Sequence, residues 1–194
     1  SLETTTGNTN TSVGTYSLMN NTTGSKNTCV GRSAGSSITT GQKNTCIGYV
    51  AGSSITTGTG NTVIGSGAAA SSATATQEIT LGNSSIATLR CNVQTISSLS
   101  DGRDKTDVID LPEGLAFISK LRPVKFKWAT RDGNGKDGLH EHGFIAQDLQ
   151  ATQKDNDADY LNMVMDENPD RLEASYGKLV PILTKAIQEL SAKV

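Results

Sequence analysis

The sequence predicts two architectures in one chain: an all-β fibre segment of the trimeric β-roll or β-helical kind, then an α+β domain ending in a long helix. Three observations support this prediction. A 17-residue repeat fills positions 10–65, charge and proline arrive together after position 99, and apolar residues at heptad-like spacing close the chain. We therefore divide the chain into a fibre segment (1–75), a β cap or connector (76–99) and a C-terminal domain (100–194).

Composition and charge exclude several classes of function. The 194 residues are 35% hydrophobic and carry a formal net charge of −2. Residues 1–99 hold four basic and two acidic side chains, and residues 100–194 hold thirteen and seventeen, so neither half has the basic stripe of a nucleic-acid-binding protein. No apolar run approaches the ~18 residues of a membrane span, and the first 25 residues lack a signal-peptide pattern. Because the repeat pattern is already under way at the first residues, we expect further chain upstream.

The repeat predicts stacked coils of short strands and turns. Each unit has an Asn-Thr pair, an apolar residue three positions after the asparagine, and then a glycine. The asparagines are Asn10, Asn27, Asn44 and Asn61, and the apolar residues are Val13, Val30, Ile47 and Ile64. β-Branched residues bounded by asparagine and glycine are typical of short strands joined by turns, and a fixed short period is typical of quasi-one-dimensional stacking.

Two interpretations of the repeat are open. Each coil offers about one inward Val or Ile plus small residues such as Ala34 and Ala51, too little to offset an ordering cost of roughly 1–2 kcal/mol per residue in one chain. The segment is either disordered low complexity, or several chains wind together so that each inward residue meets its symmetry mates. The apolar residues keep the same position in every repeat, and this favours the interpretation that several chains wind together. Cys29 and Cys46 share a repeat position and should then stack one coil apart as buried free thiols.

Each later element has its own signal. Residues 77–99 continue the strand pattern with a denser apolar set and are expected to close the fibre. In the C-terminal domain we expect a helix over 112–121, a strand over 123–128, a loop over 131–138, a strand entering a helix over 142–150 and a hairpin over 160–176.

The last element is a helix with a coiled-coil spacing. Its apolar residues are separated by 4, 3, 4, 3 and 4 positions: Tyr176, Val180, Leu183, Ile187, Leu190 and Val194. This helix either packs on its own domain or associates with other copies of the chain.

The segment Ser-Asp-Gly-Arg-Asp-Lys, residues 100–105, holds a serine and a lysine five positions apart. Neither a helix nor a strand brings such positions together. Either Asp101-Gly102 makes a turn that folds Lys105 onto Ser100, or the lysine comes from a neighbouring chain.

Four ordered motifs resemble one family. They are residues 100–105, Leu-Arg-Pro-Val-Lys-Phe-Lys-Trp at 121–128, Gly-Phe-Ile-Ala-Gln-Asp at 143–148, and the apolar pattern of the last helix. The family is the C-terminal intramolecular chaperone of phage tail fibres, tailspikes and endosialidases, also found in the myelin regulatory factor. The repeat separately resembles the β-roll heads and shafts of trimeric adhesins.

The resemblance implies a homotrimeric chaperone that helps three chains wind into a β-fibre and then cuts itself off, as a single-turnover serine endopeptidase. The family's nucleophile maps to Ser100 and its partner lysine to Lys105, with the scissile bond at Leu99–Ser100. His142 or its neighbour His140 would orient or assist the reaction. The supporting motif positions are Asp101, Arg103, Gly143 and Gln147.

The resemblance further implies the C-terminal part of a viral tail fibre or spike, assembled in the host cytoplasm and located in the virion. Its partners would be two further copies of the chain and a host-surface receptor. The alternative is a non-cleaving fibre tip whose terminal domain stays attached as a permanent trimerisation cap. We expect no cofactor and no metal, since His-Glu-His at 140–142 offers two ligands without a third, and the Asp-rich loops depart from the calcium-loop pattern.

Overall fold

The computed structural model describes residues 6–92, 96–131 and 133–193. The chain forms two compact units. The first comprises Ser1–Ala87 with the loop Ala129–Asp137, and the second comprises Thr88–Trp128 with Gly138–Val194.

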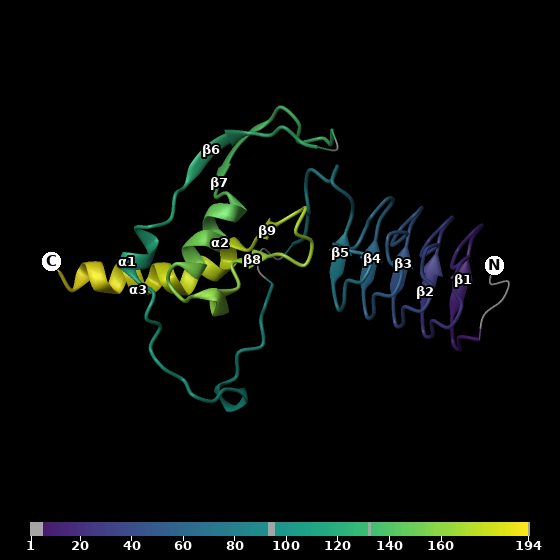
Figure 1. The fold of residues 1–194 in the computed structure, drawn as a ribbon, viewed down its shortest axis with the longest axis horizontal. Coiled ribbons are helices and arrows are strands. Elements are labelled where there is room, and N and C mark those ends of the chain that lie inside the picture. Colours follow the sequence, from purple (N-terminus) through teal and green to yellow (C-terminus); the bar gives the residue numbers. More distant parts are fainter. Residues whose placement is uncertain (1–5, 93–95, 132, 194) are drawn as a thin grey trace. The chain divides into compact units, whose positions relative to one another are not determined.

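The first unit is a parallel β-solenoid. Its sheet has the strands β1 (Thr11–Val13), β2 (Thr28–Val30), β3 (Thr45–Ile47), β4 (Thr62–Ile64) and β5 (Ile79–Leu81), side by side in chain order (Figure 1). Neighbouring strands pair in parallel with an offset of one repeat, so that Thr11 faces Thr28 and Thr28 faces Thr45. The expected stacked β architecture is confirmed, and the ladder continues through β5.

The solenoid encloses an apolar core of its own, which the sequence interpretation underestimated. The middle residue of the inner strands points inward, and an alanine and a larger aliphatic residue fill the rest of each coil. The fully buried members are Leu18, Cys29, Ala34, Ile38, Cys46, Ala51, Ile55 and Val63. Val13, Val30, Ile47 and Ile64 lie outside this core with side chains 36–56% exposed, so their expected contact with symmetry mates stays a prediction. Side chains alternate across a strand, and the inward middle residue therefore directs its neighbours outward.

Cys29 and Cys46 stack as expected, since they are direct partners in the register of β2 and β3. Both are free and buried. The hydrogen bond with Cys46, together with burial, raises the pKa of the Cys29 thiol.

A buried asparagine ladder joins the coils. The main-chain N–H of Asn44 donates to Oδ1 of Asn27 (3.0 Å), and its side-chain amide donates to the same Oδ1 (3.1 Å) and to the carbonyl of Gly58 (2.8 Å). Asn61 repeats this pattern on Asn44. Glu78 takes the asparagine position in the last coil, and its N–H donates to Oδ1 of Asn61 (3.0 Å). These hydrogen bonds satisfy the polar side-chain and main-chain groups that are buried inside each coil.

The second unit is α+β. It contains α1 (Leu115–Ile118), β6 (Val124–Lys127), β7 (His140–Gly143), α2 (Ala146–Lys154), β8 (Val164–Met165), β9 (Glu173–Ala174) and α3 (Leu179–Ser191). Three short 3-10 helices, η1 (Gly102–Asp104), η2 (Asp159–Leu161) and η3 (Tyr176–Lys178), complete it. The β6–β7 and β8–β9 pairs are antiparallel. The expected helices, strand and hairpin are confirmed, although the strand before α2 lies over His140–Gly143 rather than over the apolar residues that follow.

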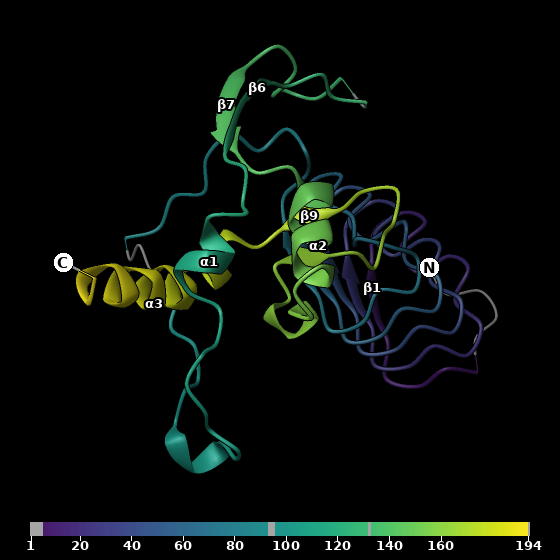
Figure 2. The same cartoon turned by 60° about the vertical axis from the view of Figure 1, so that its left-hand side comes forward.

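One core holds this unit together. Its buried members are Phe117, Leu149, Ala158, Leu161, Met163, Leu179 and Ile182. Helix α1 lies against α3 (Figure 2). The carboxylate of Glu189 accepts from the N–H of Leu115 (2.8 Å) and so satisfies the start of α1.

Helix α3 has two apolar faces. One face is buried in the core through Leu179, Ile182 and Ala186. The other face, which we call the α3 seam, consists of Val180, Leu183, Ile187 and Leu190, and these side chains are 43–66% exposed. No helix in the described part of the chain is long and apolar enough to cross a membrane.

Candidate active site

Ser100 lies in an exposed segment that leads into η1. Leu99 before it is fully exposed. Asp101 caps the short helix, because its carboxylate accepts from the main-chain N–H of Arg103 (2.9 Å). The guanidinium of Arg103 returns to the same carboxylate (2.6 Å). The contacts between Asp101 and Arg103 thereby hold the backbone of this segment in a turn.

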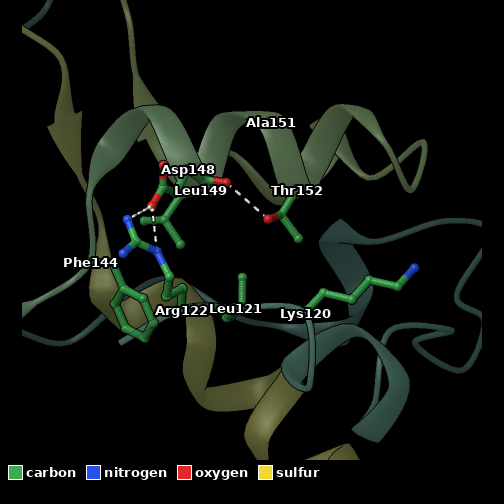
Figure 3. Close-up of a pocket in the computed structure, with 8 residues that line it drawn as sticks. All are labelled: Lys120, Leu121, Arg122, Phe144, Asp148, Leu149, Ala151 and Thr152. Atoms are coloured by element: carbon green, nitrogen blue, oxygen red, sulfur yellow. Dashed lines mark hydrogen bonds and ion pairs between the residues drawn. The ribbon is translucent and has the colours of Figure 1, made fainter. Parts of the chain in front are cut away.

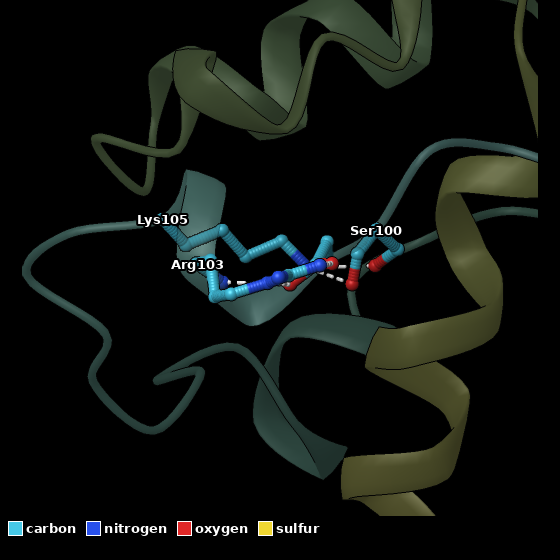
Figure 4. Close-up of polar contacts among 4 residues, drawn as sticks. Ser100, Arg103 and Lys105 are labelled. Atoms are coloured by element: carbon cyan, nitrogen blue, oxygen red, sulfur yellow. Dashed lines mark hydrogen bonds and ion pairs between the residues drawn. The ribbon is translucent and has the colours of Figure 1, made fainter.

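This turn brings Lys105 back to Ser100. The Nζ of Lys105 donates to Oγ of Ser100 at 2.6 Å and to the carbonyl oxygen of Ser100 at 3.1 Å (Figure 4). The main-chain N–H of Lys105 donates to the carbonyl of Gly102 (3.3 Å) and closes the turn. Within one chain, the turn is thus sufficient to bring Lys105 to Ser100, and a lysine supplied by a neighbouring chain stays the alternative.

The local charges support the same turn. The hydrogen bond from Arg103 holds the pKa of the Asp101 carboxyl below its ordinary value. The same contact raises the pKa of Arg103. Both groups are therefore charged at neutral pH, and the ion pair that fixes the turn is intact there.

The arrangement has the parts of a nucleophile and base pair. A serine hydroxyl becomes a nucleophile when a neighbouring amine, in its neutral form, accepts the proton. Oγ of Ser100 is within hydrogen-bond reach of the Lys105 side chain. The hydroxyl of Ser98 also lies 3.4 Å from the carbonyl oxygen of Leu99, on the bond that precedes Ser100.

The two histidines lie elsewhere in the same unit. On β7, His142 faces Lys125 and His140 faces Lys127 across the β6–β7 pair. Among the described residues, no hydrogen bond or ion pair joins His142 to Ser100 or Lys105.

The other motif positions have packing environments of their own. A Cβ on Gly143 would lie 2.5 Å from the hydroxyl of Tyr176, so the glycine leaves room for that side chain. The same hydroxyl accepts from the N–H of Phe144 (3.0 Å), and the two rings meet edge to face. Gln147 lies exposed in the first turn of α2.

An ion pair that the sequence interpretation did not pick out joins two of the motifs. The guanidinium of Arg122 donates to Asp148 on α2 (2.7 Å) beside an open pocket of about 330 Å³ (Figure 3). The pocket is lined by Lys120, Leu121, Arg122, Phe144, Asp148, Leu149, Ala151 and Thr152. The sequence places an arginine in one motif and an aspartate in another, and these opposite charges could have suggested an ion pair. Their separation along the chain does not show that the two residues meet. In the described ranges no group of three His, Cys, Asp or Glu side chains could hold a metal ion.

The second unit thus combines an exposed serine–lysine turn with an α+β core and a helix whose outer face is apolar. Residues 100–157 match the family model described as the chaperone of endosialidase, a peptidase family. The resemblance to this family that the sequence predicts is thereby confirmed over residues 100–157. Comparison with curated proteins and with solved structures gave no match.

Proposed function

We propose that this chain is the C-terminal part of a phage tail fibre or spike, and that its terminal domain trimerises three chains, assists the winding of the β-solenoid and then releases itself by cleavage at Leu99–Ser100. The observation that carries the proposal is the 2.6 Å hydrogen bond between Lys105 and Ser100, at the first residue of the matched family domain. The parent fibre would be part of the virion and bind a host-surface receptor.

Two exposed apolar rows support a homotrimer. The first is the α3 seam. The second, which we call the solenoid row, runs along the outer side of the strands through Val13, Val30, Ile47, Ile64 and Leu81. Continuous apolar rows of this kind mark interaction surfaces, and each row would be buried by the same row of two further copies of the chain.

The order of events follows from folding kinetics. Parallel coils pair residues in register over many non-local contacts, which is slow and open to slippage when three chains must align. A domain that trimerises first raises the local concentration of the three chains. Once this domain has been removed, the chains can no longer unfold and dissociate by the reverse of the assembly pathway, and the fibre is kinetically stable.

The proposed cleavage is balanced in atoms and charge. Oγ of Ser100 attacks the carbonyl carbon of Leu99 while the neutral amine of Lys105 takes the hydroxyl proton. The C–N bond breaks, the nitrogen of Ser100 receives that proton from Lys105, and an ester joins Leu99 to Oγ. Water then hydrolyses the ester and leaves a carboxylate on Leu99 and a free amine on Ser100.

Assembly would control this reaction. Ser100 and Lys105 are exposed in the single chain. Burial disfavours a charged amine, and lysine becomes a base most readily where it is desolvated. We propose that neighbouring chains cover the turn in the trimer, so that cleavage follows assembly.

A permanent trimerisation cap is the second candidate, favoured by the solvent exposure of the serine–lysine turn. The intact masses of the full chain and of S100A and K105R variants, taken on denatured samples of verified trimers, distinguish the two. Self-release requires two pieces split at Leu99–Ser100 from the parent and whole chains from both variants. A parent trimer that stays whole on prolonged incubation establishes the cap instead.

A further inference from the structure

The β6–β7 ribbon has one strongly basic side. Lys125 faces His142 and Lys127 faces His140 in the antiparallel register, and cross-strand partners lie on the same side of a sheet. We call these four residues the basic face. All four side chains are exposed, and no hydrogen bond or ion pair engages them within the described residues.

The other side of the ribbon supplies no counter-charge. It carries Val124, Phe126 and Trp128, with the two rings packed edge to face. Glu141, the acidic residue of β7, lies on that side opposite Phe126, and its carboxylate accepts from the indole N–H of Trp128 (2.7 Å).

Such a face has a cost for the isolated domain. Lys125 and Lys127 lie two positions apart on the same side of β6, and like charges gathered on one side of a strand pair repel one another. A two-stranded ribbon is marginally stable even without this repulsion. An anionic surface docked on the basic face would remove the penalty.

The solenoid has few acidic residues to form that surface. Residues 1–87 contain two acidic residues, Glu3 and Glu78. The carboxylate of Glu78 is already occupied by the main-chain N–H of Ser71 and the hydroxyl of Thr80. Among copies of this chain, the larger source of counter-charge is the C-terminal domain, which has an excess of acidic residues.

Exposed acidic residues lie in more than one segment of that domain. Several carboxylates are engaged, since Asp101 pairs with Arg103, Asp148 with Arg122, and Glu113 accepts from Tyr160. In contrast, the exposed residues Asp155, Asp157 and Asp159, which we call the acidic loop, accept no side-chain hydrogen bond and form no ion pair within the described chain. Asp107 and Asp110 are equally exposed, but they lie in a segment without helix or strand. The acidic loop lies instead at the junction of α2 and η2, whose residues Leu149 and Leu161 are part of the core, so its carboxylates are held in place.

We propose that the basic face of one chain docks on the acidic loop of the next chain in the trimer. This inference rests on the homotrimer of the proposed function and adds a specific contact to it. The contact is heterologous, and a threefold rotation closes it into a ring of three identical pairs. The contact determines which surfaces of neighbouring chains meet, and it makes assembly depend on ionic strength. It acts together with the apolar contact of the α3 seam.

The test is a charge exchange in the full chain, with S100A as the parent so that cleavage does not interfere. We expect K125E/K127E and D155K/D157K each to raise the concentration for half-assembly by about tenfold or more at low salt, measured by sedimentation velocity. Combining all four substitutions should restore assembly to within about threefold of the parent, because the charges are exchanged rather than lost. K26E/K43E makes the same charge change on two exposed lysines of the solenoid and should leave assembly unchanged.

The outcomes separate this contact from the trimer itself. A parent that does not trimerise overturns the homotrimer of the proposed function. A parent trimer that K125E/K127E leaves unaffected overturns the docking contact alone, as does a fourfold variant that assembles no better than the double variants. Loss of heparin retention in K125E/K127E without a change in assembly would assign the basic face to an external polyanion, and this too would overturn the contact.

Discussion

Asn44 directs two hydrogen bonds to a single atom, Oδ1 of Asn27, one from its main-chain N–H and one from its side-chain amide. A third bond from the same amide reaches the carbonyl of Gly58 in the following coil. One side chain thus joins three successive turns of the solenoid.

Replacing Asn44 should therefore destabilise the solenoid strongly. N44A leaves the buried carbonyl of Gly58 and the amide N–H groups of the next rung with fewer partners, and each unsatisfied buried group costs about 1–3 kcal/mol. We expect a lower thermal unfolding midpoint by circular dichroism. N20A, at an exposed asparagine of the same segment, should have little effect, and equal midpoints for the two variants would contradict the role of the ladder.

Asp101 should affect cleavage through the turn that it caps. In D101A the carboxylate no longer holds the N–H and guanidinium of Arg103, so Lys105 should spend less time on Ser100. We expect cleavage to slow by several-fold to about tenfold, followed by intact mass over time, with trimer formation unchanged. D104A removes a carboxylate from the same short helix that caps nothing, and should cleave at the parent rate. A D104A rate as low as that of D101A would assign the effect to charge alone.

The Asp101–Arg103 pair also predicts a pH range for the turn. The pKa of Asp101 is below its ordinary value of 3.8, so the pair stabilises the turn fully above that value and loses this effect as pH falls through the lower folded pKa. Carboxyl carbon shifts in the S100A variant should give a midpoint for Asp101 below 3.8. R103A should move that midpoint upward, and an unchanged midpoint would show that Arg103 is not the cause.

The α3 seam should be separable from the core of its own domain. Ile187 is 66% exposed and Ile182 is fully buried on the same helix. I187E should abolish trimers in sedimentation while leaving the helical circular dichroism signal of the chain intact. I182E should instead unfold the domain, because it buries a charge without a partner. Q188E adds a negative charge next to the seam and should still trimerise; trimers of I187E would exclude the seam from the interface.

Much of the fold could be predicted because its signals are local or periodic. The spacing of Asn27 and Asn44 gave the coil length, and the shared repeat position of Cys29 and Cys46 gave their stacking. The inward residues could not be predicted from the period alone, since the period does not tell which face of a three-residue strand points inward. Ile38 and Ile55 lie outside the strands and were overlooked for this reason.

The candidate site was predictable in its residues and not in its geometry. Ser100 and Lys105 were identified from motifs, but their contact depends on how Asp101 and Arg103 bend the backbone between them. The Arg122–Asp148 pair joins positions 26 residues apart, and nothing in either motif alone specifies its partner. Contacts of this kind arise only when the elements that carry the residues pack together.

Glu78 gives the solenoid a defined last coil. A carboxylate can accept hydrogen bonds, but when ionised it has no proton to donate, so Glu78 cannot extend to a further coil the side-chain bond that Asn61 makes to the carbonyl of Ala75 (2.7 Å). A 17-residue repeat that carries an asparagine at this position can be duplicated, because each new asparagine makes the same hydrogen bonds as the one before it. A repeat that carries glutamate there cannot be continued in this way. Fibre length in such a protein can therefore vary by gain or loss of whole repeats upstream, while the junction with the C-terminal domain stays the same.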